Sequence, residues 1–165
     1  MNKLLIASLV LASCSPVYSS ETPITGNVQT RCLITTDTNG VFGNPLPSKL
    51  STLSADGGVV PVVRYDVTLA DSYLAKVTTP TTFSSSPSLS DSVAWTGSTT
   101  VTNTTDVGMA GYEAAKVMYG STTQYDLTVA GSTWFSSEAT AVYGASKSFP
   151  GGIYTAIVLA ECIAK

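Results

Sequence analysis

The sequence predicts an all-β protein whose strands form a sandwich or a barrel. Short segments alternate between apolar and polar residues with a period of two, and turn residues recur between them. The clearest segment places Val63, Tyr65, Val67 and Leu69 on one face and polar side chains on the other. This pattern is typical of a half-buried strand.

Other segments repeat the pattern. A second clear strand carries Tyr125, Leu127 and Val129 on one face, and a less regular one covers 28–34. Further strands are expected around Val93 and Trp95, and around Val117 and Tyr119. Turns are expected at the Gly-containing segments 56–58, 97–98 and 130–132. Strands interrupted this often favour a sandwich or barrel over a mixed fold.

Two stretches are less regular. Residues 78–92 are crowded with Thr, Ser and Pro, which predicts a long exposed loop or an edge region. Residues 109–118 contain a short stretch that favours one helical turn. Neither an internal repeat nor a linker is visible, so the 165 residues are interpreted as one domain.

The last expected strand, 153–163, is apolar on both faces. Ile153, Ile157, Leu159 and Ile163 fall on one face, and smaller residues with Tyr154 and Val158 fall on the other. Such a strand is expected to be covered on both faces. It is either a middle strand of the sandwich or a strand beside a groove that another chain fills.

Composition and charge exclude some partners. Charged residues make up 12% of the chain, hydrophobic residues make up 44%, and the formal net charge is −3. The few basic residues are scattered, so the sequence offers no stripe that would neutralise phosphates. Nucleic acid is therefore not an expected partner, and neither is an anionic membrane surface.

The N-terminus predicts export. A short basic start is followed by an apolar run, 4–12, which is too short to span a bilayer. The favoured interpretation is a signal peptide over residues 1–19. The alternative is a lipobox-like tetrapeptide ending at Cys14, whose lipidation would anchor the chain to a membrane.

The remaining cysteines, Cys32 and Cys162, are expected to pair, because two thiols in a stable exported domain usually do so. The alternative is a pair of separate buried thiols. The chain has no histidine, no P-loop and no nucleophile-elbow motif. No catalytic residue, metal site or cofactor is predicted, and an enzymatic function is not expected.

Residues near the two ends carry a family resemblance. The segment Pro150-Gly151-Gly152-Ile153-Tyr154-Thr155-Ala156-Ile157-Val158 resembles the closing strand of chaperone–usher pilins, in particular archaic, spore-coat-protein-U-like fimbrial subunits. The segment Thr25-Gly26-Asn27-Val28-Gln29-Thr30-Arg31-Cys32 resembles the start of such a subunit. The resemblance covers both ends, whereas the middle is similar only in its general composition and strand pattern.

The resemblance implies an immunoglobulin-like sandwich that lacks one strand, here over residues 31–165. The gap is filled by the N-terminal segment of a neighbouring copy, here residues 20–30. Ile24 and Val28 would be the inserted apolar side chains, Gly26 the small position, and the last strand (Ile153, Tyr154, Ile157, Val158, Leu159) would flank the groove.

The implied function is a structural subunit of an extracellular pilus that serves adhesion or biofilm formation. Its implied partners are copies of itself in a head-to-tail homopolymer, a periplasmic chaperone and an outer-membrane usher. The alternative function is a surface-anchored lipoprotein sandwich, lipidated at Cys14, that acts as an adhesin or a carbohydrate-binding module.

Overall fold

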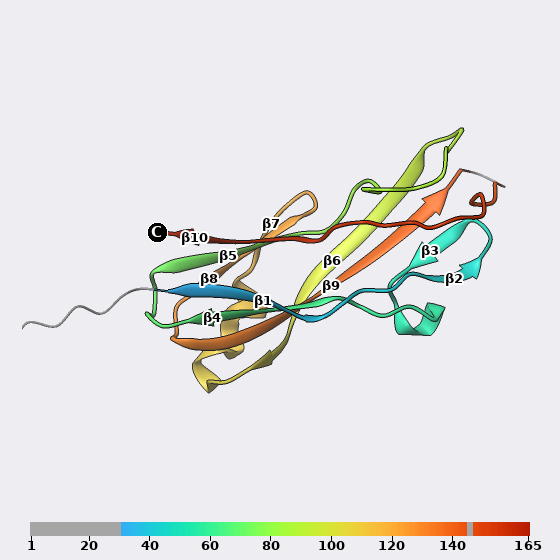
Figure 1. The fold of residues 1–165 in the computed structure, drawn as a ribbon. Helices are drawn as coiled ribbons and strands as arrows, with labels where there is room; N and C mark the ends of the chain where they lie inside the picture. Colours follow the sequence, from blue (N-terminus) through green and yellow to red (C-terminus); the bar gives the residue numbers. More distant parts are fainter. Residues whose placement is uncertain (1–30, 145–146) are drawn as a thin grey trace, which may run out of the picture.

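The computed structural model describes residues 31–144 and 147–165, and these residues form two antiparallel β-sheets packed face to face (Figure 1). The larger sheet has the order β1 (Cys32–Thr38), β4 (Val62–Val67), β9 (Gly131–Tyr143), β3 (Lys49–Ser51), β2 (Gly43–Leu46), with β6 (Val93–Thr104) on the other edge of β9. The smaller sheet has the order β10 (Leu159–Ala164), β5 (Tyr73–Thr78), β8 (Thr122–Leu127), β7 (Val117–Tyr119). The predicted all-β sandwich is confirmed.

The main core lies where the two sheets overlap. The alternation in β4 puts Val63, Tyr65 and Val67 on the inner face, where they are buried against Val77 of β5 and Phe135 of β9. The helical turn expected within 109–118 is confirmed as η2 (Val107–Gly111) and α1 (Tyr112–Ala115). Leu69 and Val129 lie beyond the ends of their strands.

The larger sheet is longer than the smaller one, and this difference decides where the site lies. We call the end at which β1 begins and β10 ends the proximal end, and the end with the β2–β3 hairpin the distal end (Figure 1). The long strand β9 runs through both halves and pairs with β4 proximally and with β3 distally. In the distal half, irregular segments cover its inner face in place of the smaller sheet.

The distal half is filled by aromatic side chains. Phe83, from the loop 79–92, packs edge-to-face on Trp95, Phe149 and Tyr154, with ring centroids 4.7–5.9 Å apart. Phe42 joins the same cluster through Phe83 and Trp95. The predicted loop is therefore present, and its one aromatic residue holds it against the sheet.

The turn expected at 97–98 is wrong. Gly97 lies inside β6, opposite Ala139 of β9. A Cβ at this position would lie 2.8 Å from both the Glu138 carbonyl oxygen and the Thr79 side chain. The glycine therefore permits a close approach of the chain after β5 and does not mark a turn.

Two buried tyrosines join the layers through their hydroxyl groups. The Tyr65 hydroxyl lies 3.1 Å from the carbonyl oxygens of Lys76 and Glu161 and shares its one proton between them, which ties β4 to β5 and β10. The Tyr125 hydroxyl donates to the Thr99 carbonyl at 2.8 Å. Burial raises the pKa of both side chains above the ordinary value.

These raised pKa values predict alkaline destabilisation. Unfolded tyrosines lose their protons near pH 10, whereas the buried ones keep them, so the free energy of unfolding should fall as pH rises above about 10. The slope is at most about 1.4 kcal/mol per pH unit for each tyrosine. Urea denaturation between pH 8 and about 11.5 measures it. Tyr125→Phe should flatten the fall, and Tyr119→Phe, at an exposed position on β7, is the matched control. An equal slope in both variants would contradict the assignment.

Candidate functional site

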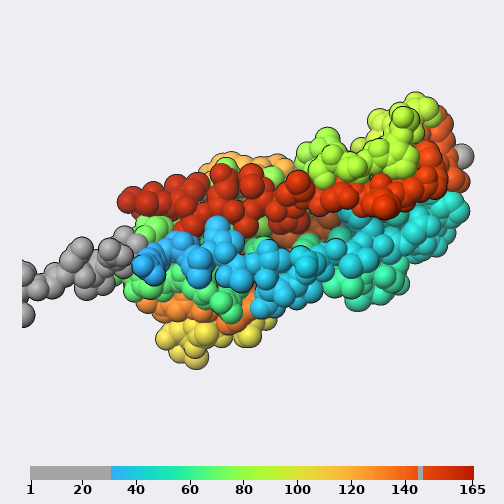
Figure 2. Space-filling model, in the orientation of Figure 1, coloured from blue at the N-terminus to red at the C-terminus, as the bar shows by residue number. Residues whose placement is uncertain are grey.

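The two sheets leave an open seam along one side of the sandwich. β1 is the edge strand of the larger sheet and β10 is the edge strand of the smaller sheet. These two edges face each other, and no strand pairing joins them in the part of the chain that the structure describes. Figure 2 looks onto this seam, with the C-terminal segment (red) on one side and the first strand (blue) on the other. Edge strands carry unpaired backbone donors and acceptors, so the seam can accept a further strand.

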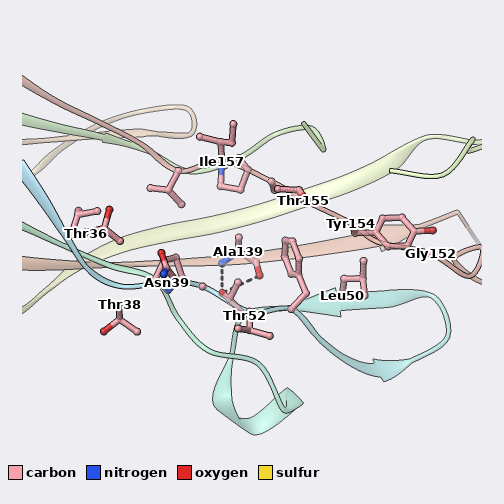
Figure 3. Close-up of a pocket in the computed structure, with 18 residues that line it drawn as sticks. Thr36, Thr38, Asn39, Leu50, Thr52, Ala139, Gly152, Tyr154, Thr155 and Ile157 are labelled. Atoms are coloured by element: carbon pink, nitrogen blue, oxygen red, sulfur yellow. Dashed lines mark hydrogen bonds between the residues drawn. The ribbon is translucent and has the colours of Figure 1, made fainter. Parts of the chain in front are cut away.

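The seam opens distally into a groove of about 620 Å³. One wall is formed by 36–42, which is the end of β1 and the residues after it, and the other by 152–158. The floor includes Leu50 and Ala139, both labelled in Figure 3, and Val63, all from the larger sheet. All three floor residues are buried, so the groove reaches down to the core of the sandwich.

Small side chains on β9 create the depth of the groove. In the proximal half the inner face of β9 carries Phe135, whereas at the level of the groove it carries Ala139. Ala141 follows before the large Tyr143 at the distal end. Beside Ala139, the Thr52 hydroxyl donates to the Ala139 carbonyl at 3.3 Å and accepts from its N–H at 2.9 Å (Figure 3). The polar atoms of this part of the floor therefore have partners, and an apolar side chain can be placed over them.

The wall 152–158 has one edge with few partners. Among the described residues, only Thr155 of this wall forms backbone hydrogen bonds with other segments. Its N–H donates to the Ser85 carbonyl at 2.9 Å, and its carbonyl accepts from the Ser84 N–H at 2.8 Å. Successive residues of an extended chain direct their backbone groups to opposite edges. Tyr154 and Ala156 therefore direct theirs away from Ser85 and toward the seam.

The rim of the groove is aromatic. Phe42 and Tyr154 line it from opposite walls, and both belong to the aromatic cluster of the distal half. The Tyr154 hydroxyl donates to the Pro150 carbonyl at 2.7 Å, and desolvation raises the pKa of this side chain. These contacts fix the ring at the rim, so the distal mouth of the groove has a defined shape.

The groove carries no ionisable acid or base among its described lining residues apart from the Tyr154 phenol. The ion pairs between described residues lie elsewhere, for example Lys147 with Asp91 at 2.9 Å and Lys76 with Glu161 at 2.8 Å. An occupant is therefore selected by apolar side chains and by backbone hydrogen bonding, and a charged side chain inside the groove would lose hydration without gaining a partner.

The predicted disulfide is confirmed and closes the seam at its proximal end. Cys32 of β1 and Cys162 of β10 are bonded, and their Cα atoms are 6.4 Å apart. Both residues pack against the main core. The bond therefore joins the two sheets at the end of the seam that lies away from the groove.

The predicted site residues at the C-terminal end are brought to the seam, with two corrections. The expected strand 153–163 is a strand only over β10, because 152–158 runs past the end of β5 and is joined to the loop by a single bridge between Thr155 and Ser85. The expectation that both faces are covered is also wrong. Tyr154 and Val158 point inward, but Ile153, Ile157 and Leu159 are 84%, 63% and 51% exposed.

The sequence did not predict the opposite wall or the part of the floor around Ala139. Wall residues 39–42 follow β1 without any periodic pattern, and Ala139 lies in an unbroken strand. The single signal was the change from large to small inward residues along β9, and its meaning depends on where the smaller sheet ends. The predicted signal peptide with Cys14, and the donor residues Ile24, Gly26 and Val28, lie outside the described residues.

Within the described ranges, no cluster of three or more His, Cys, Asp or Glu side chains could hold a metal ion. The helices described are also too short to cross a membrane. Comparisons with protein-family models, curated proteins and solved structures found no match to this chain.

Proposed function

We propose that this protein is a structural subunit of an extracellular fibre, and that one copy polymerises onto the next by inserting residues 20–30 into the groove. The observation that carries the proposal is the seam, which joins two unpaired strand edges to an apolar groove open to the core. An inserted strand would pair with one or both edges and bury its alternating side chains on the floor.

The donor segment matches the groove in chemistry and in length. Ile24, Gly26 and Val28 recur at every second position, so all three can face the floor while Thr25 and Asn27 face outward. Each groove wall, 36–42 or 152–158, spans roughly 23 Å when extended at a strand rise of about 3.3 Å per residue. A stretch of this length contains the three apolar positions with one residue to spare at each end.

The placement of the chain ends favours insertion between copies. The described chain starts at Arg31, at the proximal end, whereas the groove lies toward the distal end (Figure 1). A donor segment that leaves one end of a molecule and enters the opposite end of the next produces a head-to-tail contact. Such a contact does not close on itself, so repetition gives a filament.

The proposed fibre would be assembled on a cell surface. The fibre subunit would be exported through the periplasm, kept from premature pairing by a chaperone, and assembled by an outer-membrane usher. A chaperone would occupy the same groove, because exposed edges and an apolar floor aggregate when they are left free. The resulting pilus would serve adhesion or biofilm formation.

A charge in the donor segment tests the proposal. Val28→Asp should abolish polymers, because a carboxylate would be buried in a groove that offers it no ionic partner. Gln29→Asp, one position along and expected to face outward, should leave polymerisation intact. Purified chains would be sized by gel filtration and by unboiled gel electrophoresis. Polymers of the Val28→Asp chain, or loss of polymers in both variants, would contradict the assignment of the inward face.

A further inference from the structure

We propose that the Cys32–Cys162 disulfide is the end stop of the groove and limits how far the inserted strand can enter. This inference rests on the proposed function, and it assigns to the disulfide a role in register that goes beyond holding the fold together. It concerns the proximal part of the seam, where β1 and β10 are close to each other.

Strand spacing excludes a third strand at the level of the disulfide. Hydrogen-bonded neighbours in a sheet lie about 4.8 Å apart, so two strands that flank an inserted third lie about 9.6 Å apart. The Cα atoms of Cys32 and Cys162 are 6.4 Å apart and covalently fixed. No strand can therefore pass between β1 and β10 at this level.

Other contacts hold the proximal end closed around the disulfide. The Tyr65 hydroxyl donates to the Glu161 carbonyl, next to Cys162. At the chain end, the Lys165 N–H donates to the Ser72 carbonyl at 3.0 Å, and its ammonium group pairs with Asp126 at 2.6 Å. These bonds fix β10 to the proximal body, so the seam cannot widen there by moving β10 alone.

The stop also fixes the direction of the inserted strand. The donor segment continues into its own folded body at Cys32, so its C-terminal end must leave the groove through an open mouth. The proximal end is closed by the disulfide, which leaves the distal mouth beside Phe42 and Tyr154. The N-terminal end of the donor therefore points toward the disulfide, which closes the seam ahead of it.

The consequence is a fixed register. A donor strand with a longer alternating pattern gains nothing from its extra residues, because the groove ends near Thr36 and Val158. The contacts of Tyr65 and Lys165 keep β10 in place, so loss of the disulfide frees β1 alone to move away from β10, and the groove can then extend toward the proximal end. The bond thus selects a short insert and prevents slippage by two residues, which would preserve the alternation.

Peptide binding to the full chain tests this inference. The acceptor is the oxidised Val28→Asp chain, whose groove is intact. One fluorescent peptide has the sequence of residues 24–30, and a second is lengthened at its N-terminus by Ile-Thr-Ile-Thr, which would lie beside 32–35 if the seam were open there. We expect the two affinities for the oxidised acceptor to agree within about twofold, and the longer peptide to bind roughly tenfold more tightly once Cys32 and Cys162 are replaced by Ser.

Two results would overturn the inference. One is tighter binding of the longer peptide to the oxidised chain, and the other is equal binding of both peptides to the chain without the disulfide. Failure of either peptide to bind the oxidised acceptor would instead contradict the proposed function itself. The outcomes are therefore distinguishable.

A second measurement covers the case in which the chain without the disulfide does not fold. In wild-type polymers, amide hydrogen exchange over seconds should slow roughly tenfold or more in the edge amides of 36–42 and 152–158, relative to the Val28→Asp monomer. The edge amides of 32–35 should keep exchanging at the monomer rate. Equal slowing along the whole of β1 would show that the strand passes the disulfide and would overturn the inference.

Discussion

Ala139→Phe is expected to abolish polymerisation while leaving the folded monomer intact. Ala139 is buried at the floor of the groove, and its side chain faces the space that an inserted strand would fill. A phenylalanine there would occupy this space, so the donor side chains of the next copy could not reach the floor. Since the groove is open, the new ring has room, and we expect it to cost less than the roughly 1–3 kcal/mol typical of an overpacked core.

The matched control is Ala94→Phe. Ala94 is exposed on β6, opposite Val142 of β9, so this substitution adds the same ring on the outer face of the same sheet. Polymers should form as in the wild type. Gel filtration and unboiled electrophoresis measure the polymers, and circular dichroism checks the fold. Continued polymerisation of the Ala139→Phe chain would show that the groove is not the acceptor.

The second large effect is expected from removing the disulfide. Cys32 and Cys162 are separated by 130 positions, so their bond constrains nearly the whole described chain in the unfolded state. The chain-entropy model assigns about 4–5 kcal/mol to a loop of this length, which is a large part of the 5–15 kcal/mol typical of a domain. Replacing both cysteines by Ser should lower the free energy of unfolding by up to this amount.

The measurement is urea denaturation of the monomeric Val28→Asp chain, with and without the two Ser substitutions. Reductant should lower the midpoint of the disulfide-containing chain and leave that of the Ser variant unchanged, which separates the bond from the substitutions. If the free energy of unfolding falls by less than about 1 kcal/mol, the other contacts of the seam, those of Tyr65 and Lys165 among them, are what hold it closed.

Local patterns predicted the parts of the fold that local physics decides. The alternation at 63–67 identified β4 and its buried face, because a strand with one covered side needs apolar residues at every second position. The Thr-, Ser- and Pro-rich stretch 78–92 identified the long loop. Cysteine parity predicted the disulfide. None of these features depends on how far one sheet extends past the other.

The candidate site depends on that difference, and so it was predicted only in part. The apolar character of 153–163 suggested a covered strand, but the sheet that would cover it ends at Thr78 of β5, and the side chains of Ile153 and Ile157 remain exposed. Gly97 was expected to lie in a turn, because a glycine followed by a serine is common there. Its actual role is a close contact with Thr79, which is distant in the sequence and leaves no local pattern. The small side chain of Ala139 marks the groove only once the end of the smaller sheet is known.

The measurement that tests the central claim most directly is a mixture of two variants that cannot polymerise alone. The Val28→Asp chain lacks a working donor but keeps its groove, and the Ala139→Phe chain lacks a working groove but keeps its donor. If one copy inserts its N-terminal segment into the next, the mixture should give a heterodimer of one chain of each kind, capped at both ends, while each chain alone stays monomeric. A mixture that remains monomeric, while wild-type chains polymerise under the same conditions, would contradict head-to-tail strand insertion through this groove.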